Sequence, residues 1–243
     1  MIVLMTDFSE SEYAGMMKGV IYTIYPKARV VDLTHEISPQ SVREGAWILL
    51  QGYPYFPKKT TFVCVVDPGV GTGRDAVLIR TKNYVFIGPD NGLMYPSVHK
   101  DGIKEIFKIQ IDQPEFTTFH GREIFAKVAA YVASGAGEKL LGERKSDLDI
   151  VLRFWQEGRS GEVVRVDHFG NIITNLPPLD KDLYHLNYRA LNRDITWAST
   201  YGKGPEYDMF LVTGSAGTLE LSVKNGRAAD RLPARVGDTI VIK

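Results

Sequence analysis

The sequence predicts an α/β protein: a mainly parallel N-terminal sheet sandwiched between helices, followed by a smaller all-β domain. Two observations support this prediction. Strand-like and helix-like patterns alternate up to about residue 150, a rhythm typical of parallel sheets with helices on both faces. Beyond that point only short strand patterns follow, separated by glycine, proline and asparagine turns. We therefore expect an N-terminal domain over residues 1–155 and a C-terminal domain over 160–243.

The individual elements follow from the spacing of apolar residues and from residues that begin or end helices. In the N-terminal part, strands are expected at 2–6, 29–34, 61–66, 76–81 and 84–87, the last two as a hairpin, and helices over 16–24, 46–50 and 122–134. Ser41 and Glu44 form the pattern of a capping box, and Gly135 is placed to end the third helix. In the C-terminal part, strands are expected at 161–166, 210–213, 218–223 and 239–242, with no long helix.

The composition argues against several classes of protein. Lys plus Arg and Asp plus Glu both number 29, so no net field attracts nucleic acid or an anionic membrane. No apolar run is long enough to span a bilayer, and the first residues read as a strand without the basic start of a signal peptide. The single Cys64 cannot form an internal disulfide, as is typical of a reducing compartment. We expect a cytoplasmic protein.

The segment from Asp67 to Arg74, Asp-Pro-Gly-Val-Gly-Thr-Gly-Arg, directly follows a predicted buried strand. In open α/β sheets, ligands bind beyond the carboxyl ends of strands, so a site is expected at this loop. The loop lacks the Gly-Lys-Ser/Thr ending of a P-loop and precedes a strand, so no helix N-terminus is available to a phosphate. Two interpretations stay open: the glycines let the backbone approach a ligand, or the loop is a tight turn in which Asp67 caps its own backbone.

A second segment, Phe119-His120-Gly121, enters the third predicted helix. A histidine at such a position is often structural, but Gly121 leaves space beside His120. The five histidines lack metal-binding spacing and no Gly-x-Ser-x-Gly elbow is present, so we expect neither a metal site nor a serine nucleophile. Asp67, Arg74 and His120, on two glycine-marked loops, form the candidate reaction centre.

A third segment, Asp167-His-Phe-Gly-Asn171, lies in the all-β part. If it is a strand, Asp167, Phe169 and Asn171 alternate onto one face, offering a carboxylate for an ammonium, a ring for stacking and an amide for hydrogen bonds. The alternative is a turn with Gly170 and Asn171 at its tip, since this pair is a strong hairpin signal.

Asp7, at the end of the first strand, and two glycine-rich segments are weaker candidates. Asp7 could bind a diol through its two oxygens, or it could cap the helix that begins after Ser9. The segments 214–217 and 225–229 read as turns.

Taken together, these segments resemble the S-adenosylmethionine hydroxide adenosyltransferases, relatives of the fluorinating and chlorinating adenosylmethionine enzymes. The similarity runs along the whole chain. It rests on Thr-Asp-Phe at 6–8, Asp-x-Thr-His at 32–35, Asp-Pro-Gly-Val-Gly-Thr at 67–72, Pro-Asp-Asn-Gly-Leu at 89–93, Phe-His-Gly-Arg-Glu-Ile-Phe at 119–125, Asp-x-Phe-Gly-Asn at 167–171 and Gly-x-Ala-Ala at 226–229. Each motif alone is weak, but seven in the same order are specific.

The resemblance implies hydrolysis of S-adenosyl-L-methionine (SAM) to adenosine and L-methionine, without a cofactor or metal. It also implies a barrel-like C-terminal domain and a trimer whose active sites lie between subunits. Asp67, Arg74 and His120 match the trio that holds the attacking water, and Arg74 should pair with Asp67 and lower the pKa of His120. The expected substrate-binding residues are Asp7 at the ribose, Phe119 and Gly121 beside the reaction centre, and Asp167, Phe169, Asn171, Ser215 and Ala228 at the adenine or methionine ends.

Two other functions stay open at this point: a halogenase that uses chloride, and a non-catalytic protein that binds SAM or adenosine. The halogenating relatives carry other residues at the places of Asp67 and His120, and a serine at that of Gly121, so this sequence falls on the water-using side. It departs from the family at residues 8–13, where Ser9 replaces a glycine in a loop that looks one residue shorter, and at Ala216, where the fluorinating relative has arginine.

Overall fold

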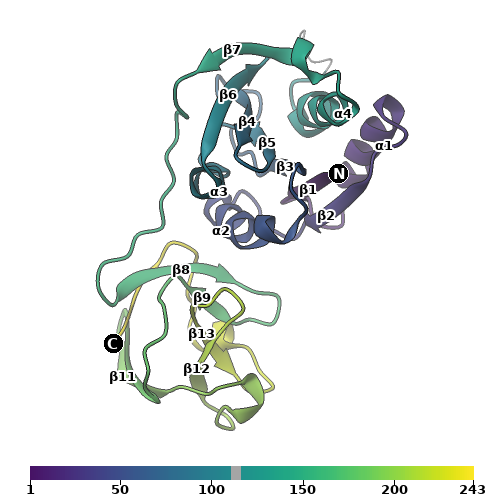
Figure 1. Ribbon diagram of the computed structural model, residues 1–243. Coiled ribbons are helices and arrows are strands. Elements are labelled where there is room, and N and C mark those ends of the chain that lie inside the picture. Colours follow the sequence, from purple (N-terminus) through teal and green to yellow (C-terminus); the bar gives the residue numbers. More distant parts are fainter. Residues whose placement is uncertain (111–115) are drawn as a thin grey trace. The chain divides into compact units, whose positions relative to one another are not determined.

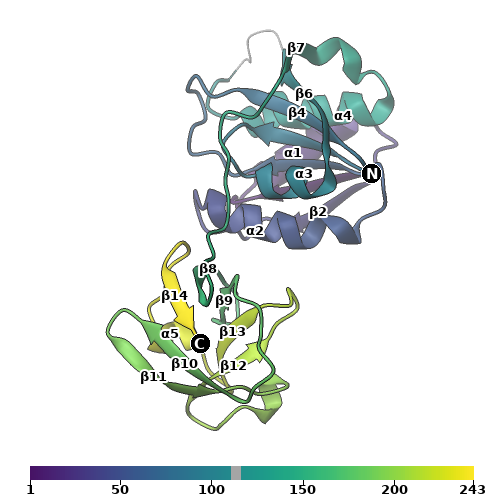
Figure 2. The ribbon, with the colours of Figure 1, turned by 60° about the vertical axis from the view of Figure 1, so that its left-hand side comes forward.

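The computed structural model describes residues 1–110 and 116–243 of the chain. The chain divides into two compact units, Met1–Leu152 and Arg153–Lys243. Figures 1 and 2 show both units from two directions. None of the helices in the described residues combines the length and the apolar character needed to cross a membrane.

The N-terminal unit is built on a seven-stranded sheet in the order β2-β1-β3-β5-β4-β6-β7. Its strands are β1 (Ile2–Thr6), β2 (Val30–Thr34), β3 (Thr61–Val65), β4 (Ala76–Thr81), β5 (Val85–Pro89), β6 (Ile103–Ile109) and β7 (Leu141–Lys145). The run β2-β1-β3-β5 is parallel, as predicted, and β4, β6 and β7 extend it with antiparallel pairs. The predicted hairpin is the pair β4–β5, whereas β6 and β7 are not predicted.

Helices cover both faces of this sheet (Figure 1). Apolar side chains form a layer between the helices and the sheet on each face. The helices are α1 (Tyr13–Ile24), α2 (Val42–Gly52), α3 (Tyr95–Asp101) and α4 (Lys127–Ser134). On one face, α1 and α4 pack against Ile2 and Leu4 of β1. On the other, α2 and α3 pack against Val3 and Met5 of the same strand. Successive side chains of the buried strand β1 thus point to opposite faces of the sheet and contribute to both apolar layers.

Two local predictions need correction or refinement, and a third is confirmed. Ser41 stands at the N-cap of α2 but its side chain makes no capping bond, and the Glu44 carboxylate accepts from the backbone N–H of Ser38 at 3.1 Å instead, so the capping box is wrong. The predicted helix 122–134 begins as a π-helical turn, Gly121–Ala126, and continues as α4. It ends as expected at Gly135, whose φ of 84° is left-handed.

The C-terminal unit is an antiparallel sheet in the order β11-β10-β14-β8-β9-β13-β12. Its strands are β8 (Ser160–Val166), β9 (Ile172–Thr174), β10 (Leu183–Tyr188), β11 (Leu191–Thr196), β12 (Met209–Thr213), β13 (Leu219–Val223) and β14 (Thr239–Ile242). A 3₁₀ segment, Tyr201–Lys203, and a short α-helix, α5 (Ala228–Arg231), complete it. A bridge between Trp197, just after β11, and Leu211 of β12 nearly closes the sheet around its apolar core. The barrel-like, all-β domain expected after the α/β part is therefore present, although β9, β10 and β11 are not predicted.

Candidate active site

The loop after β3 joins two of the predicted residues in one ion pair. Asp67 follows the strand and Arg74 precedes β4, and the loop folds back so that the guanidinium meets the carboxylate. Nε of Arg74 donates to Oδ1 of Asp67 at 3.0 Å, and Nη2 donates to Oδ2. The side chains are only 11% and 6% exposed, so water screens this two-point pairing weakly. The backbone does turn here, with Val70 N–H donating to the Asp67 carbonyl, but the carboxylate pairs with Arg74 instead of capping the loop.

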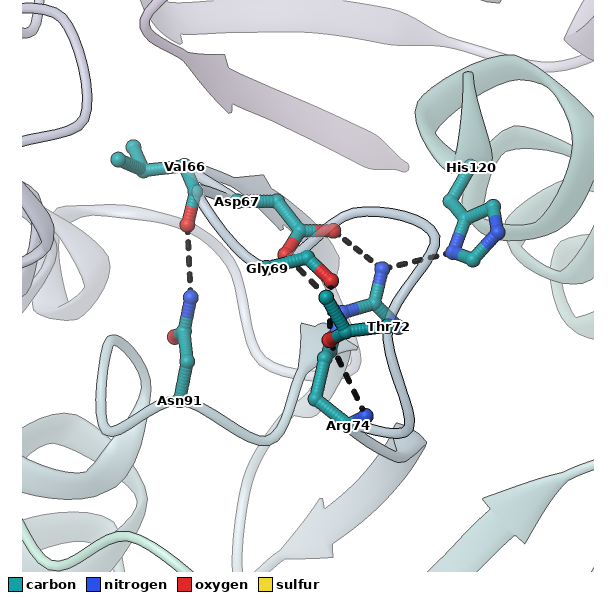
Figure 3. A network of polar contacts seen from close by, with 7 residues as sticks. All are labelled: Val66, Asp67, Gly69, Thr72, Arg74, Asn91 and His120. Carbon is teal, nitrogen blue, oxygen red and sulfur yellow. Dashed lines mark hydrogen bonds and ion pairs between the residues drawn. The ribbon is translucent and has the colours of Figure 1, made fainter. Parts of the chain in front are cut away.

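His120 completes the group from a different element (Figure 3). It is the N-cap residue of the π-helical turn, and its Nδ1 lies 2.8 Å from Nη2 of Arg74. A guanidinium has only donors, so Nδ1 must accept this hydrogen bond. The neutral imidazole therefore carries its proton on Nε2. One Arg74 nitrogen thus lies between the carboxylate and the imidazole.

The surroundings of His120 favour this neutral form. Burial and the positive charge of Arg74 lower the pKa of His120 below its ordinary value, and the Asp67 carboxylate opposes them only in part. The expected effect of Arg74 on this pKa is confirmed. The imidazole is consequently uncharged near pH 7, and its Nε2–H donor has no hydrogen-bond partner among residues 1–110 and 116–243.

The group borders a cavity of about 800 Å³, a volume within the usual range for small-molecule sites. Asp67, Phe119, His120 and Gly121 line it, and Asp7 lines it from the end of β1. Five predicted residues of the N-terminal unit, from three separate loops, therefore surround one hollow.

Asp7 does not serve as a helix cap. Helix α1 begins at Tyr13 with Glu12 at its N-cap, and no side chain makes a capping bond there. Oδ2 of Asp7 instead accepts the backbone N–H of Gln40 at 2.8 Å. This fixes the carboxylate at the cavity wall, and of the two alternatives from the sequence, helix capping is wrong.

An aromatic cluster, Phe8, Tyr13 and Phe119, forms another wall of the cavity. Its three ring centroids lie 5.1–5.8 Å apart in edge-to-face contacts. Gly121 is close-packed beneath it, because a Cβ there would lie 3.0 Å from the Phe119 ring. Arg122 stacks over Phe119 at 5.1 Å. Of these lining residues, Phe8, Tyr13 and Arg122 are not named as candidates in the sequence analysis, since a single aromatic or basic residue gives no spacing signal of its own.

In the C-terminal unit, the segment 167–171 is a turn between β8 and β9, so its interpretation as a strand face is wrong. Asp167 closes the turn: its carboxylate accepts both the backbone N–H of Asn171 at 2.8 Å and the Asn171 side-chain amide at 2.9 Å. Gly170 has the left-handed φ of 81° that this tip requires. The turn leaves the ring of Phe169 72% exposed.

Ala228, predicted as a binding residue, lies next to this turn. It is the first residue of α5, and the N–H of its neighbour Ala229 donates to the carbonyl of Gly170 at 3.0 Å. Ser215 lies on the exposed turn between β12 and β13. The structure thus brings Asp167, Phe169, Asn171 and Ala228 together, with Ser215 on a separate loop of the same unit.

No cluster of three or more metal-ligating side chains occurs among residues 1–110 and 116–243.

Both units match models of the same protein family. Residues 2–142 match the N-terminal domain of the SAM hydroxide adenosyltransferases, and residues 161–241 match their C-terminal domain. The chain belongs to the SAM hydroxide adenosyltransferase family.

Its relatives include proteins named as enzymes and a protein of solved structure. The chain is 33% identical to the (R)-S-adenosyl-L-methionine hydrolase of Salinispora arenicola, over 97% of its own length and 94% of the relative's. A fluorinase of an Actinoplanes species is less similar, at 26% identity over 78% of this chain and 76% of the relative's. A crystal structure of an uncharacterized conserved protein from Thermotoga maritima is 35% identical and superposes with a TM-score of 0.91 over the full length of both chains.

Proposed function

We propose that this protein is an enzyme that hydrolyses SAM to adenosine and L-methionine, by in-line attack of water on the ribose C5′. The observation that carries the proposal is the Asp67–Arg74–His120 group at the wall of a cavity of about 800 Å³. Family membership and the relative named (R)-S-adenosyl-L-methionine hydrolase support the same reaction.

The chemistry needs a held nucleophile and a proton acceptor, and little else. The sulfonium of SAM makes methionine a neutral leaving group, so no general acid is needed at the sulfur and no cofactor takes part. Water must lie in line with the breaking C–S bond, about 3–3.5 Å from carbon. It becomes strongly acidic as its oxygen bonds to carbon, so a base beside it must take the proton.

Asp67 is the proton acceptor in this proposal. Nδ1 of His120 already accepts from Arg74, and its Nε2 already carries a proton, so the neutral imidazole has no free lone pair. Each oxygen of Asp67 keeps a second lone pair beyond the one used by Arg74. Arg74 holds the carboxylate in place, and His120 holds Arg74 while offering its Nε2–H to the cavity.

The remaining predicted residues receive binding roles. Asp7, fixed by Gln40, would bind the ribose hydroxyls through its other oxygen. Phe119, above Gly121, would border the ribose and the sulfonium. The cluster Asp167, Phe169, Asn171 and Ala228, with Ser215, would bind the adenine and methionine ends.

We further propose a cytoplasmic homotrimer in which the N-terminal unit of one subunit and the C-terminal unit of a neighbour form each active site. What supports it is the distribution of the predicted residues over two units with separate cores, together with the family resemblance. No binding of nucleic acid or membrane is proposed, because basic and acidic residues balance at 29 each.

The deciding experiment is a reaction in H₂¹⁸O with each sulfonium epimer of SAM, followed by mass spectrometry of the products. We expect adenosine carrying ¹⁸O at its 5′ position and an equal amount of unlabelled methionine. Adding chloride tests the halogenase: 5′-chloro-5′-deoxyadenosine in place of adenosine would overturn the proposal. Tight binding of SAM by calorimetry with no product would identify a non-catalytic binding protein instead.

A further inference from the structure

The loop 67–75 is fixed at both ends by residues that the proposed reaction does not use. At its start, Nδ2 of Asn91 donates to the carbonyl oxygen of Val66 at 2.8 Å (Figure 3). At its end, the backbone N–H of Asp90 donates to the carbonyl oxygen of Asp75 at 2.9 Å. Two consecutive residues after β5 therefore hold both ends of the loop that carries Asp67 and Arg74.

A lysine from a distant strand reinforces the second of these attachments. Nζ of Lys145, the last residue of β7, lies 2.9 Å from Oδ2 of Asp75, 2.8 Å from Oδ2 of Asp90 and 2.9 Å from Oδ1 of Asp149. The side chains of Lys145 and Asp90 are 9% and 1% exposed. Burial by itself lowers the pKa of Lys145, but the hydrogen bonds that its ammonium donates to the three carboxylates outweigh it and raise the pKa, so the ammonium stays charged.

This ammonium separates two carboxylates that would otherwise repel each other. Asp75 and Asp90 both contact the same Nζ, and Asp90, whose side chain is 1% exposed, lies where water screens charge poorly. Lys108 also pairs with Asp75, at 3.2 Å, but its side chain is 41% exposed. Without Lys145, repulsion between the carboxylates would push the start of β4 away from the end of β5. Arg74, directly before Asp75, would move with it.

We propose that Lys145 is a positioning residue for Arg74: by holding the Asp75 and Asp90 carboxylates together, it keeps Arg74 in reach of Asp67 and His120. The lysine is 70 residues away from Asp75 in sequence and contacts no reacting atom in this scheme. The effect on rate rests on the proposed hydrolysis. The effect on the position of Arg74 can be measured without it, through the pKa of His120.

The test compares three variants with the wild-type full chain. Lys145→Met removes the ammonium with similar side-chain length. Lys108→Met is the matched control, since it removes the exposed lysine on the same carboxylate. The double variant Lys145→Met with Asp75→Asn removes the ammonium together with the repulsion. For each we would measure kcat and KM for SAM, and the pKa of His120 by NMR, with its signal assigned through His120→Asn.

We expect kcat of Lys145→Met to fall roughly 10- to 100-fold with KM little changed, as for a small displacement of a reaction centre. The pKa of His120 should rise, because the charge of Arg74 moves away. Lys108→Met should match the wild type, and the double variant should recover most of kcat and of the lowered pKa. Besides Asp67 and Arg74, the ionisable groups around this cavity are Asp7, Tyr13 and Arg122, which none of the variants alters.

Several results would overturn the proposal. Wild-type kcat in Lys145→Met would do so, as would a loss of kcat with an unchanged His120 pKa, which indicates a merely structural role. A double variant with no higher kcat than Lys145→Met would exclude repulsion between the Asp75 and Asp90 carboxylates as the cause of the loss. If Lys145→Met does not fold, the double variant decides alone: a His120 pKa back at its ordinary value contradicts the proposal. Absence of hydrolysis by the wild type would instead reject the proposed function, and the His120 titrations would remain interpretable.

Discussion

At the scale of single residues, the contact between Arg74 and His120 separates two roles that sequence alone leaves open. Because the guanidinium donates to Nδ1, the imidazole cannot take a proton from water and keep this hydrogen bond. Asp67 and His120 should therefore respond differently to conservative replacement.

We expect Asp67→Asn to lower kcat by about 100-fold or more, the usual scale for loss of a positioned base. His120→Asn should lose only about tenfold, since its Oδ1 can replace Nδ1 as the acceptor for Arg74 and one hydrogen bond to the cavity is lost. Steady-state kinetics with SAM give both values. A His120→Asn enzyme as impaired as Asp67→Asn would make histidine the base.

The pH dependence follows from the lowered pKa of His120. Protonation of Nδ1 would displace Arg74 and put two cations side by side, so the neutral imidazole is the active form. We expect kcat/KM to hold steady as the pH falls to 6.5 and to decline only at more acidic pH. A pH–rate profile measures this. The acidic decline of kcat/KM that reports His120 should disappear in His120→Asn. A wild-type decline with its midpoint above pH 6.5 would contradict the attribution of this decline to His120.

At the scale of secondary-structure elements, the helix that carries His120 ends at a glycine with a testable conformation. Gly135 has a φ of 84°, which costs an L-residue about 1 kcal/mol. We expect Gly135→Ala to lower the free energy of unfolding by about that amount. Gly19→Ala is the matched control. Gly19 lies within α1, and a Cβ added there would have open space around it, so alanine should stabilise the helix by about 0.5–1 kcal/mol. Urea denaturation measures both changes in the free energy of unfolding. Two stabilising or two destabilising substitutions would contradict this prediction.

The elements also show how far sequence patterns reach. The run 2–6 is predicted at its true bounds because a continuous apolar run of this length fits a buried strand and is too short for a helix. The hairpin signal at Gly170-Asn171 was right and the strand interpretation of the same residues wrong, because a left-handed glycine and the Asp167 carboxylate close the turn. Interactions within these few residues therefore decide between a turn and a strand. Strand β6, with the sequence IKEIFKI, was missed since its polar residues give no clear period of two.

Contacts between distant elements are what the sequence does not supply. The two glycine-marked loops could be recognised as candidates, and the pairing of Asp67 with Arg74 could be expected from the family. Nothing in the spacing predicts that Lys145 joins Asp75 to Asp90 or that Asn91 holds Val66, because these contacts depend on which strands become neighbours in the sheet. Asp90 and Asn91 belong to the motif at 89–93, but the motif does not show what they contact, and Lys145 lies outside all the motifs.

At the scale of the whole molecule, the predicted site residues fall into two groups, one on each compact unit. Asp67, Arg74 and His120 belong to the first, and Asp167, Phe169 and Asn171 to the second. If the proposed trimer places each active site between neighbouring subunits, the two groups that act together come from different chains. Rings built from one repeated interface have this property, since every subunit presents one face to the next.

Complementation between two inactive variants tests this arrangement directly. Asp67→Asn disables the first group and Asn171→Ala weakens the second, and subunits of the two kinds would be mixed after reversible dissociation. We expect the mixture to regain roughly a quarter of wild-type activity, since a site between random neighbours has an even chance of an intact half from each side. Each variant dissociated and reassembled alone is the control. A mixture no more active than the mean of these controls, despite exchange proven by mass spectrometry, would show that each site uses both units of one chain.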